Sequence, residues 1–404
     1  MNDDLEAKVG MSMNIRSIFI VVTILLSLCF NAHATVRFAH ITDLHIFEDA
    51  KRNFESKISA SDFYISIKKI NEISKNLKDA SQEPLAFVLL SGDIGVGKLL
   101  KVDPKVGKLV KDPQKWNQAL SSIAKMMHTS NVKKWLIVPG NNDLFEEQPT
   151  SVVFYRDFLK ELQDMPNIKD AGISIIDFRL DASQQAHPHS QPGMYVLQDF
   201  VFVGWDNSYF KNNNSVKNYI GKNDKVIPVA NTLEYQSVQK LSKILKECKA
   251  KYAFIFYHIP EIDDPYLIQF NEFEEGNVVS KRLKEARDLS PLFAKGLYPY
   301  SAWTVPLGVR KAWEETVTNT SGKGPIIKGL FAGHFHDHKK ETYLSTLWLK
   351  TKKYKDEILD KLYVAPPFAV KNQTHYPPPE RATGGQIITI GDKGTITREL
   401  FWFD

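Results

Sequence analysis

The chain has 404 residues, of which 43% are hydrophobic, so it is long enough to bury a sizeable core. Its formal net charge of +5 suits anionic substrates without requiring them. The sequence has no basic block interleaved with aromatic residues, which excludes a typical nucleic-acid-binding module, and its two cysteines are too few for a disulfide-based scaffold.

Residues 1–34 have the pattern of a signal peptide. Ile18 to Phe30 form a run dominated by apolar residues, and Ala32-His33-Ala34 follows as a small-residue cleavage site. We therefore expect a mature chain that begins at Thr35, is periplasmic or secreted, and has no transmembrane segment once the signal is removed. The alternative is an uncleaved membrane anchor, although the run is shorter than the roughly 20 apolar residues that span a bilayer.

Two further expectations concern this segment. Met11 or Met13 is a better start than Met1, because the acidic residues that follow Met1 do not suit a signal peptide. Cleavage would remove Cys29 and leave Cys248, so we expect no internal disulfide in the mature protein.

The first half of the mature chain alternates between apolar runs and helical patterns. We expect strands at Val36 to Thr42, Leu85 to Ser91 and Trp135 to Pro139, and helices at Ile58 to Leu77 and Gln118 to Met127. This alternation predicts βαβ units and a largely covered sheet, hence an α/β protein.

The second half contains closely spaced strands and one amphipathic helix, which spans Thr232 to Cys248. The expected strands are Tyr195 to Gln198, Val201 to Trp205, Ala253 to Tyr257, Gly329 to Ala332, Gly385 to Ile390 and Thr395 to Phe403. An irregular insertion rich in proline and aromatic residues is expected at 261–325. It is either a surface excursion with its own small apolar cluster or a lid over a substrate cleft, and the sequence does not separate these alternatives.

Five short motifs follow apolar runs, and each places oxygen or imidazole ligands in a loop. They are Asp43-Leu44-His45, Gly92-Asp93, Gly140-Asn141-Asn142-Asp143, Tyr257-His258-Ile259-Pro260 and Gly333-His334-Phe335-His336. Each motif alone is weak, but residues at the carboxyl ends of neighbouring parallel strands converge on one crevice. Mixed carboxylate, amide and imidazole ligands suit divalent ions such as Zn, Mn or Fe.

In their order and spacing these motifs resemble those of the calcineurin-like metallophosphoesterases, over nearly the whole mature chain. The layout is most similar to the acid sphingomyelinase-like phosphodiesterases and endopolyphosphatases. The resemblance implies a single catalytic domain over residues 35–404, folded as a four-layer α/β/β/α sandwich around two mixed sheets. It also implies hydrolysis of phosphomonoester, phosphodiester or phosphoanhydride bonds by a hydroxide that bridges two divalent ions.

The resemblance also implies a set of ligands. One ion would be held by Asp43, His45 and His336, and the other by Asn141, His258 and His334. Asp93 would bridge both ions, and a bridging carboxylate is needed to hold like-charged ions about 3.5–4 Å apart. Asn142 and Asp93 are the catalytic candidates.

Two positions depart from the family pattern. The third motif usually reads G-N-H followed by an acid, and the His orients phosphate or protonates the leaving group. Here Asn142 takes that place, and an amide can donate hydrogen bonds but cannot supply a proton near neutral pH. Val96 stands where purple acid phosphatases have a Tyr, which argues against the iron-tyrosinate subclass.

Other patterns have weaker chemical meaning. Gly92 to Lys98 resembles a Walker loop, but Leu99 replaces the Ser or Thr that binds magnesium, and no G-x-S-x-G elbow supports a serine hydrolase. His338 is a candidate for proton transfer, whereas His40 is expected in the core. A series of lysines forms either a basic lip that guides anionic substrate or an ordinary solvated loop: Lys98, Lys101, Lys105, Lys108 and Lys111.

A function of a different class is a metal-bound but catalytically weak protein that binds a partner. Asn142 is the feature that supports it, and the complete set of seven candidate ligands argues against it. The sequence does not distinguish lipid, nucleotide, polyphosphate or phosphoprotein substrates, and it leaves the native metals and the oligomeric state open.

Overall fold

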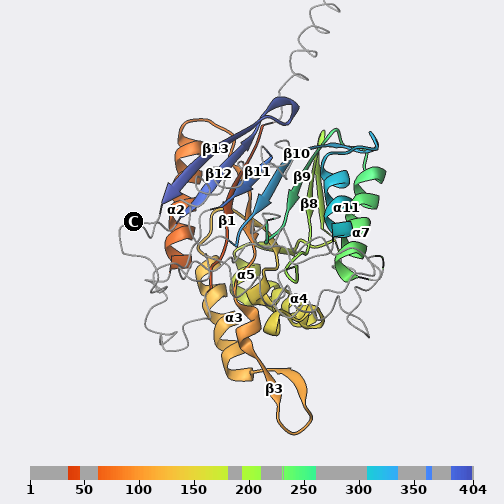
Figure 1. Ribbon diagram of the computed structural model, residues 1–404. Coiled ribbons are helices and arrows are strands. Elements are labelled where there is room, and N and C mark those ends of the chain that lie inside the picture. The colour runs from red at the N-terminus through yellow and green to blue at the C-terminus, as the bar shows by residue number, and fades with distance from the viewer. Residues whose placement is uncertain are drawn as a thin grey trace, which may run out of the picture.

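A computed structural model of the protein describes residues 35–45, 62–180, 193–210, 230, 232–260, 307–334, 361–365 and 384–402. Two β-sheets form its centre (Figure 1). The six-stranded sheet has the order β13-β12-β1-β2-β5-β6. Its strands are β1 (Val36–Ile41), β2 (Leu85–Ser91), β5 (Lys134–Val138), β6 (Ser174–Asp177), β12 (Gly384–Ile390) and β13 (Ile396–Trp402). The neighbours β1, β2, β5 and β6 pair in parallel, while β12 pairs antiparallel with both β1 and β13, so the sheet is mixed.

The five-stranded sheet has the order β11-β10-β9-β8-β7 and is also mixed. Its strands are β7 (Met194–Leu197), β8 (Phe200–Gly204), β9 (Tyr252–Phe256), β10 (Ile326–Ala332) and β11 (Leu362–Val364). Only β7 and β8 pair antiparallel among these described strands. The carboxyl ends of β8, β9 and β10 therefore lie at one edge of this sheet.

An aromatic core joins the inner faces of the two sheets. Phe38 and Phe87 from the six-stranded sheet stack with their ring centroids 4.7 Å apart. Phe202 and Phe256 from the other sheet pack against Phe87 at centroid distances of 5.4 and 6.1 Å. All four rings are fully buried, and large aromatic side chains supply much of the apolar area that stabilises such a core.

Helices cover the outer faces of both sheets. The helices α2 (Asp62–Asp79), α3 (Pro113–Met127), α4 (Val152–Asp164) and α5 (Pro166–Asp170) share one hydrophobic cluster with the six-stranded sheet. The helices α7 (Leu233–Glu247) and α11 (Leu307–Val317) share another with the five-stranded sheet, on the right in Figure 1. The layers are therefore α/β/β/α, which confirms the predicted fold class.

Local sequence explains where several elements begin. Asp112 caps α3, because its side chain accepts a hydrogen bond from the Lys115 backbone N–H, and Pro113 occupies the first helical position. Thr232 caps α7 in the same way, by accepting from Tyr235 N at 3.2 Å. The predicted strand at Leu85 to Ser91 has the observed bounds of β2.

Some local predictions were wrong. The range 261–325 was expected to be irregular, but residues 307–317 form helix α11, because Val309, Ala312, Trp313 and Val317 recur at helical spacing and are buried against the sheet. The remainder of that insertion up to residue 306 lies outside the described residues. The segment read as a loop of lysines forms a hairpin of β3 (Leu100–Asp103) and β4 (Lys108–Lys111), which projects from the body beyond α3 (Figure 1).

Candidate metal centre

Five predicted ligands lie at the carboxyl ends of strands from both sheets. Asp43, Asp93 and Asn141 follow β1, β2 and β5 of the six-stranded sheet. His258 and His334 follow β9 and β10 of the five-stranded sheet. Because the two sheets pack face to face, these strand ends meet at one end of the sandwich, and the site contains residues that are far apart in sequence.

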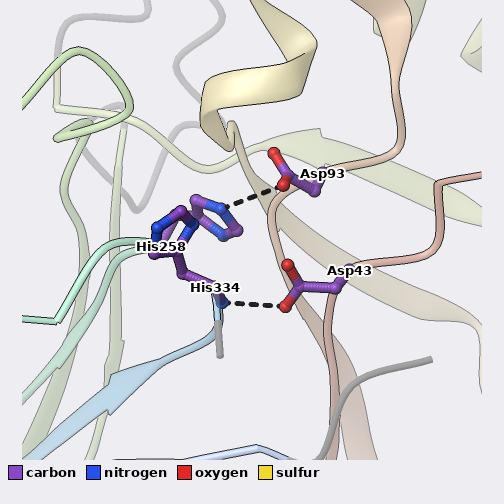
Figure 2. Close-up of side chains that lie close together, drawn as sticks. All are labelled: Asp43, Asp93, His258 and His334. Atoms are coloured by element: carbon purple, nitrogen blue, oxygen red, sulfur yellow. Dashed lines mark hydrogen bonds and ion pairs between the residues drawn. The ribbon is translucent and has the colours of Figure 1, made fainter. Parts of the chain in front are cut away.

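Four of these side chains form a compact, buried group. One ligand atom from each of Asp43, Asp93, His258 and His334 lies within 4.8 Å of the others. Figure 2 shows the two carboxylates from one sheet facing the two imidazoles from the other. Each of the four side chains is at most 3% exposed. Several ionisable groups buried this closely indicate a site for a ligand rather than for packing alone.

His45 and Asn141 extend this group. His45 Nε2 lies 3.7 Å from Asp43 Oδ1 and 3.6 Å from Asp93 Oδ2. Asn141 Oδ1 lies 3.2 Å from His258 Nε2. Asp93 Oδ2 is therefore close to His45 and also to His258, which in turn lies beside Asn141.

The backbone at this site is strained. Asp43, His45, Asp93 and His334 all have positive φ angles, between 42° and 71°. Non-glycine residues rarely adopt this left-handed region, and each such residue costs of order 1–3 kcal/mol. Backbone hydrogen bonds from the surrounding loops hold the conformation, including Asp43 N to Gly92 O and His45 N to Asp93 O.

Two motif glycines allow close approach of the loops. At Gly140 an added Cβ would overlap Asp93 Oδ1 and the Asp93 backbone nitrogen. At Gly333 an added Cβ would overlap the Thr42 hydroxyl and approach Asp43 Oδ2 at 2.9 Å. These glycines therefore bring backbone against the two carboxylates, and any side chain there would displace them.

Asn142 contacts Asp93 through both of its donors. Its backbone N–H donates to Asp93 Oδ1 and its side-chain Nδ2 donates to Asp93 Oδ2, each at 2.8 Å. The sequence led us to expect this residue to act on the phosphate. Its contacts fix the orientation of the Asp93 carboxylate, and the action on phosphate stays a prediction.

Electrostatics keep Asp93 ionised. Burial alone would raise the pKa of Asp93, but the adjacent His258 and His45 imidazoles hold it well below its usual value. His258 shows the reciprocal effect: burial would lower its pKa, and the nearby Asp93 carboxylate raises it to about 9.

His258 is oriented by two neighbours. Its Nδ1 lies 2.7 Å from Ser91 O, a contact in which the ring N–H donates to the carbonyl, so that Nε2 faces Asp93 and Asn141. The second neighbour is Asn207, whose Oδ1 accepts from the backbone N–H groups of His258 and Ile259 at 3.1 Å each. Asn207 Nδ2 also donates to Ile259 O at 2.6 Å, so one fully buried amide side chain holds the whole His258 loop.

Asp43 is oriented from both sheets. The Thr42 hydroxyl donates to Asp43 Oδ2 at 2.7 Å, and the His334 backbone N–H donates to the same oxygen at 2.8 Å. The second bond crosses from β10 to β1 and is drawn in Figure 2. Consequently Asp43 connects the sheets as well as offering a ligand atom.

Two further buried residues support the site. Asp143 accepts backbone hydrogen bonds from Gly140, Gly95 and Val96 at 2.7–3.1 Å, and so ties the Asn141 loop to the Asp93 loop. Burial and the neighbouring Asp93 raise the pKa of Asp143 to about 6. Asn207 and Asp143 were not among the predicted site residues. Asp143 closes the Gly140-Asn141-Asn142-Asp143 motif and so had a signal, whereas Asn207 had none.

The donor set fits a divalent cation. Metal–ligand bonds to carboxylate oxygen or imidazole nitrogen are about 2.0–2.2 Å long, which allows two ligand atoms on one ion to lie up to about 4.4 Å apart. The ligand atoms of Asp43, Asp93, His258 and His334 lie within 4.8 Å of one another, which is close to this separation. Hydrogen bonds that orient both carboxylates and His258 are the arrangement that metal sites need.

Comparison with known protein families agrees with this geometry. Residues 36–338 match the sequence model of the calcineurin-like phosphoesterase family, which is about three quarters of the chain. The chain belongs to the calcineurin-like phosphoesterase family. Membership indicates a metal-dependent enzyme that hydrolyses phosphate esters. A comparison with curated protein sequences found no significant match.

Three other histidines of this phosphoesterase were given roles or positions in the sequence analysis. The proposed ligand His336 and the proton-transfer candidate His338 lie outside the described residues. His40 is buried in β1 as expected, with Nε2 2.7 Å from Ser91 Oγ and Nδ1 accepting from Gln386 at 2.7 Å. Burial lowers the pKa of His40 to about 3, so it is neutral at working pH.

The lysines of the β3–β4 hairpin are partly engaged within the phosphoesterase itself. Lys101 Nζ lies 3.5 Å from Asp112 Oδ2, and Lys111 Nζ lies 2.7 Å from Glu161 Oε1. For these two side chains the geometry favours an ordinary solvated surface over a basic lip.

Proposed function

We propose that this calcineurin-like phosphoesterase is an exported hydrolase that uses two divalent ions, Zn, Mn or Fe, to cleave phosphomonoester, phosphodiester or phosphoanhydride bonds. The observation that carries the proposal is the position of Asp93, whose Oδ2 lies 3.6 Å from His45 Nε2 and 3.3 Å from His258 Nε2. A single carboxylate close to ligands proposed for both ions suits a pair of ions better than one.

The proposed ligands are those that the motifs contribute. Asp43, His45 and His336 would hold one ion, Asn141, His258 and His334 the other, and Asp93 both. When bound, the ions supply Lewis-acid stabilisation of phosphate charge and lower the pKa of a bound water. Asn141 offers a carbonyl oxygen without adding negative charge, so the site keeps a net positive charge for the phosphoryl group.

The residues of the chain then have separate tasks. Asp93 sets the separation of the two donor sets, and Asn142 holds both oxygens of Asp93 in place. Ser91 and Asn207 fix the His258 ring and its loop. These contacts restrain the ligands before substrate binds, which is how protein sites lower the cost of reorganisation during the reaction.

The alternative of a catalytically weak, partner-binding protein depended on Asn142 in place of the family's His. Because Asn142 makes two hydrogen bonds to Asp93, its presence has a reason that does not involve loss of catalysis. We therefore favour an active enzyme, with a layout similar to the acid sphingomyelinase-like phosphodiesterases and endopolyphosphatases.

Turnover measurements test the proposal. Chromogenic phosphodiesters and phosphomonoesters are supplied with Mn, Zn or Fe, one at a time, to purified full-length protein freed of metal. We expect hydrolysis of at least one substrate class with at least one ion. Absence of turnover across the whole set would support the partner-binding alternative instead.

Export is tested separately. In the described part of the chain no helix is long and apolar enough to span a membrane. The signal segment, residues 1–34, lies outside the described residues, so the proposal depends on its apolar run and on the small residues that end at Ala34. Intact mass spectrometry of the protein from its exporting cell should give a chain that starts at Thr35. A full-length, membrane-extracted species would contradict export.

A further inference from the structure

A cavity of about 380 Å³ lies outside the metal centre, between the amino-terminal ends of α4 and α7. Small-molecule sites are commonly about 300–1,000 Å³ in volume. Val152 and Val153, the first residues of α4, line one side, and Leu233, the first residue of α7, lines another. The cavity therefore has an apolar wall as well as polar groups.

The amino terminus of α4 contributes positive potential to this cavity. The backbone N–H groups of a first helical turn and the helix dipole both favour an anion. The Ser151 hydroxyl does not cap α4, because it accepts from Phe145 N and donates to Gln148 O. Helix termini alone do not define a ligand site, so the charged side chains of the cavity matter more.

Three of the four charged side chains that line the cavity are cationic. Arg156 comes from α4, Lys240 comes from α7, and Arg179 follows β6. Asp206, after β8, is the single carboxylate among the lining residues. Cations that converge from three separate elements can surround one multiply charged anion, which a lone surface lysine cannot do.

Arg179 is the buried member of this set, with a side chain only 4% exposed. Its Nε donates to Asp177 Oδ1 at 2.6 Å and its Nη2 donates to Asp177 Oδ2. Its Nη1 lies 3.8 Å from Asp206 Oδ2, which is close enough for an ion pair but too long for a hydrogen bond. A guanidinium has five N–H donors, so Arg179 keeps donors beyond the two that bind Asp177, while Asp177 and Asp206 offset its positive charge.

The cavity is also connected to the metal centre through the chain. Asp206 lines the cavity, and the next residue, Asn207, holds the His258 loop. A ligand that binds beside Asp206 would therefore lie next to Asn207, which orients the proposed metal ligand His258.

We propose that the cavity between α4 and α7 is a second anion-binding site, which takes the phosphate group of a small organic molecule. Phosphate fits because it carries up to two negative charges and can accept from donors on several sides. The apolar wall of Val152, Val153 and Leu233 would contact the organic part. The phosphate group belongs either to a distal part of the substrate or to a separate effector.

Direct binding tests this proposal without relying on catalysis. Inorganic phosphate is titrated calorimetrically into the full chain, loaded with metal and again after chelation. The proposal predicts a phosphate site that survives chelation. Lys240→Gln and Arg156→Gln should each weaken it about tenfold or more, since a hydrogen bond to a charged group contributes about that factor.

Lys243→Gln is the matched control, because Lys243 lies on the exposed surface of the same helix, α7, and does not line the cavity. It should leave phosphate binding unchanged. Failure of chelated wild-type protein to bind phosphate at tens of millimolar would overturn the proposal, as would equal binding by the two cavity variants and the wild type. Loss of enzymatic activity alone would not affect it, so failure of the proposed function is distinguishable.

A kinetic comparison then identifies the source of the phosphate group. Two aryl phosphodiesters are compared, of which one carries a second phosphate remote from the scissile bond. If the cavity holds part of the substrate, Lys240→Gln raises KM only for the substrate with the remote phosphate. If the ligand is a separate effector, inorganic phosphate changes the kcat of the wild type, and Lys240→Gln removes this change while KM stays the same for both substrates.

Discussion

Asn142→Ala separates two roles for the residue that departs most from the family pattern. The structure shows Asn142 Nδ2 donating to Asp93 Oδ2 at 2.8 Å, while the backbone N–H donates to Oδ1. Alanine removes the first bond and keeps the second. A hydrogen bond to a charged group contributes about 1.5–3 kcal/mol, which corresponds to a factor of about 10–100 in an equilibrium constant.

If Asn142 acts by holding Asp93, that factor should be lost from metal affinity. The assay is activity of Asn142→Ala as a function of free Mn, measured with a buffered metal series. We expect the half-saturating metal concentration to rise about 10–100-fold, in the range known for partners of metal ligands, with KM near the wild-type value at saturating metal. Unchanged metal dependence together with a raised KM would refute this reasoning and would show that Asn142 binds phosphate instead.

Asn142→His extends the test to proton transfer. An amide cannot protonate a leaving group, and general acid catalysis contributes about 10²–10⁴-fold, mainly for poor leaving groups. The native enzyme should therefore depend steeply on leaving-group acidity in a series of aryl phosphoesters, and the His variant should depend on it less. A flat dependence in the native enzyme that the substitution leaves unchanged would show that another residue already supplies the proton.

Three further predictions concern residues around the site. Asn207→Ala should weaken metal binding about 10–100-fold, because it releases the His258 loop. Asn207→Asp keeps both acceptor bonds and should weaken metal binding less. Equal metal affinity in the wild type and both variants would contradict a role for Asn207 in orienting His258. Gly140→Ala should abolish metal-dependent activity in a folded protein, because its Cβ would overlap Asp93, and full activity would refute the packing argument. His40 has a folded pKa of about 3, below the unfolded value of 6.5, so the unfolded chain binds more protons between these values and stability falls as pH falls through this range. Between pH 6.5 and 5, the unfolding free energy of chelated wild-type protein should therefore fall by about 2 kcal/mol more than that of His40→Gln, as measured by urea unfolding. Unfolding free energies that fall in parallel with pH in the two proteins would contradict this prediction.

Much of the fold could be predicted because it depends on local patterns. The apolar run of β2 has the composition of a strand buried on both faces, and its bounds were predicted to the residue. Thr232 and Cys248 were predicted as the ends of a helix, and they cap the observed α7. The hairpin of β3 and β4 was missed because its alternating lysines and valines lie largely on the surface and give no buried pattern.

The candidate site was predictable to the extent that its residues follow strands in motifs. Asp43, Asp93, His258 and His334 were all expected at strand ends, and the structure brings them together. The contact of Asn142 with Asp93 was not predictable, because it depends on how the β5 loop folds over the β2 loop. Asn207 was missed for a similar reason: its role arises from packing of the β8 and β9 loops, and no motif marks it.

The most direct test of the central claim is metal content measured together with activity in wild type and Asp93→Ala. The account predicts two divalent ions per wild-type chain by elemental mass spectrometry, loss of hydrolysis on chelation, and recovery when Mn or Zn is restored. Asp93→Ala should lose both the ions and the activity, because its carboxylate lies close to His45 and to His258, which are proposed ligands of different ions. Hydrolysis that survives both chelation and Asp93→Ala would contradict the account.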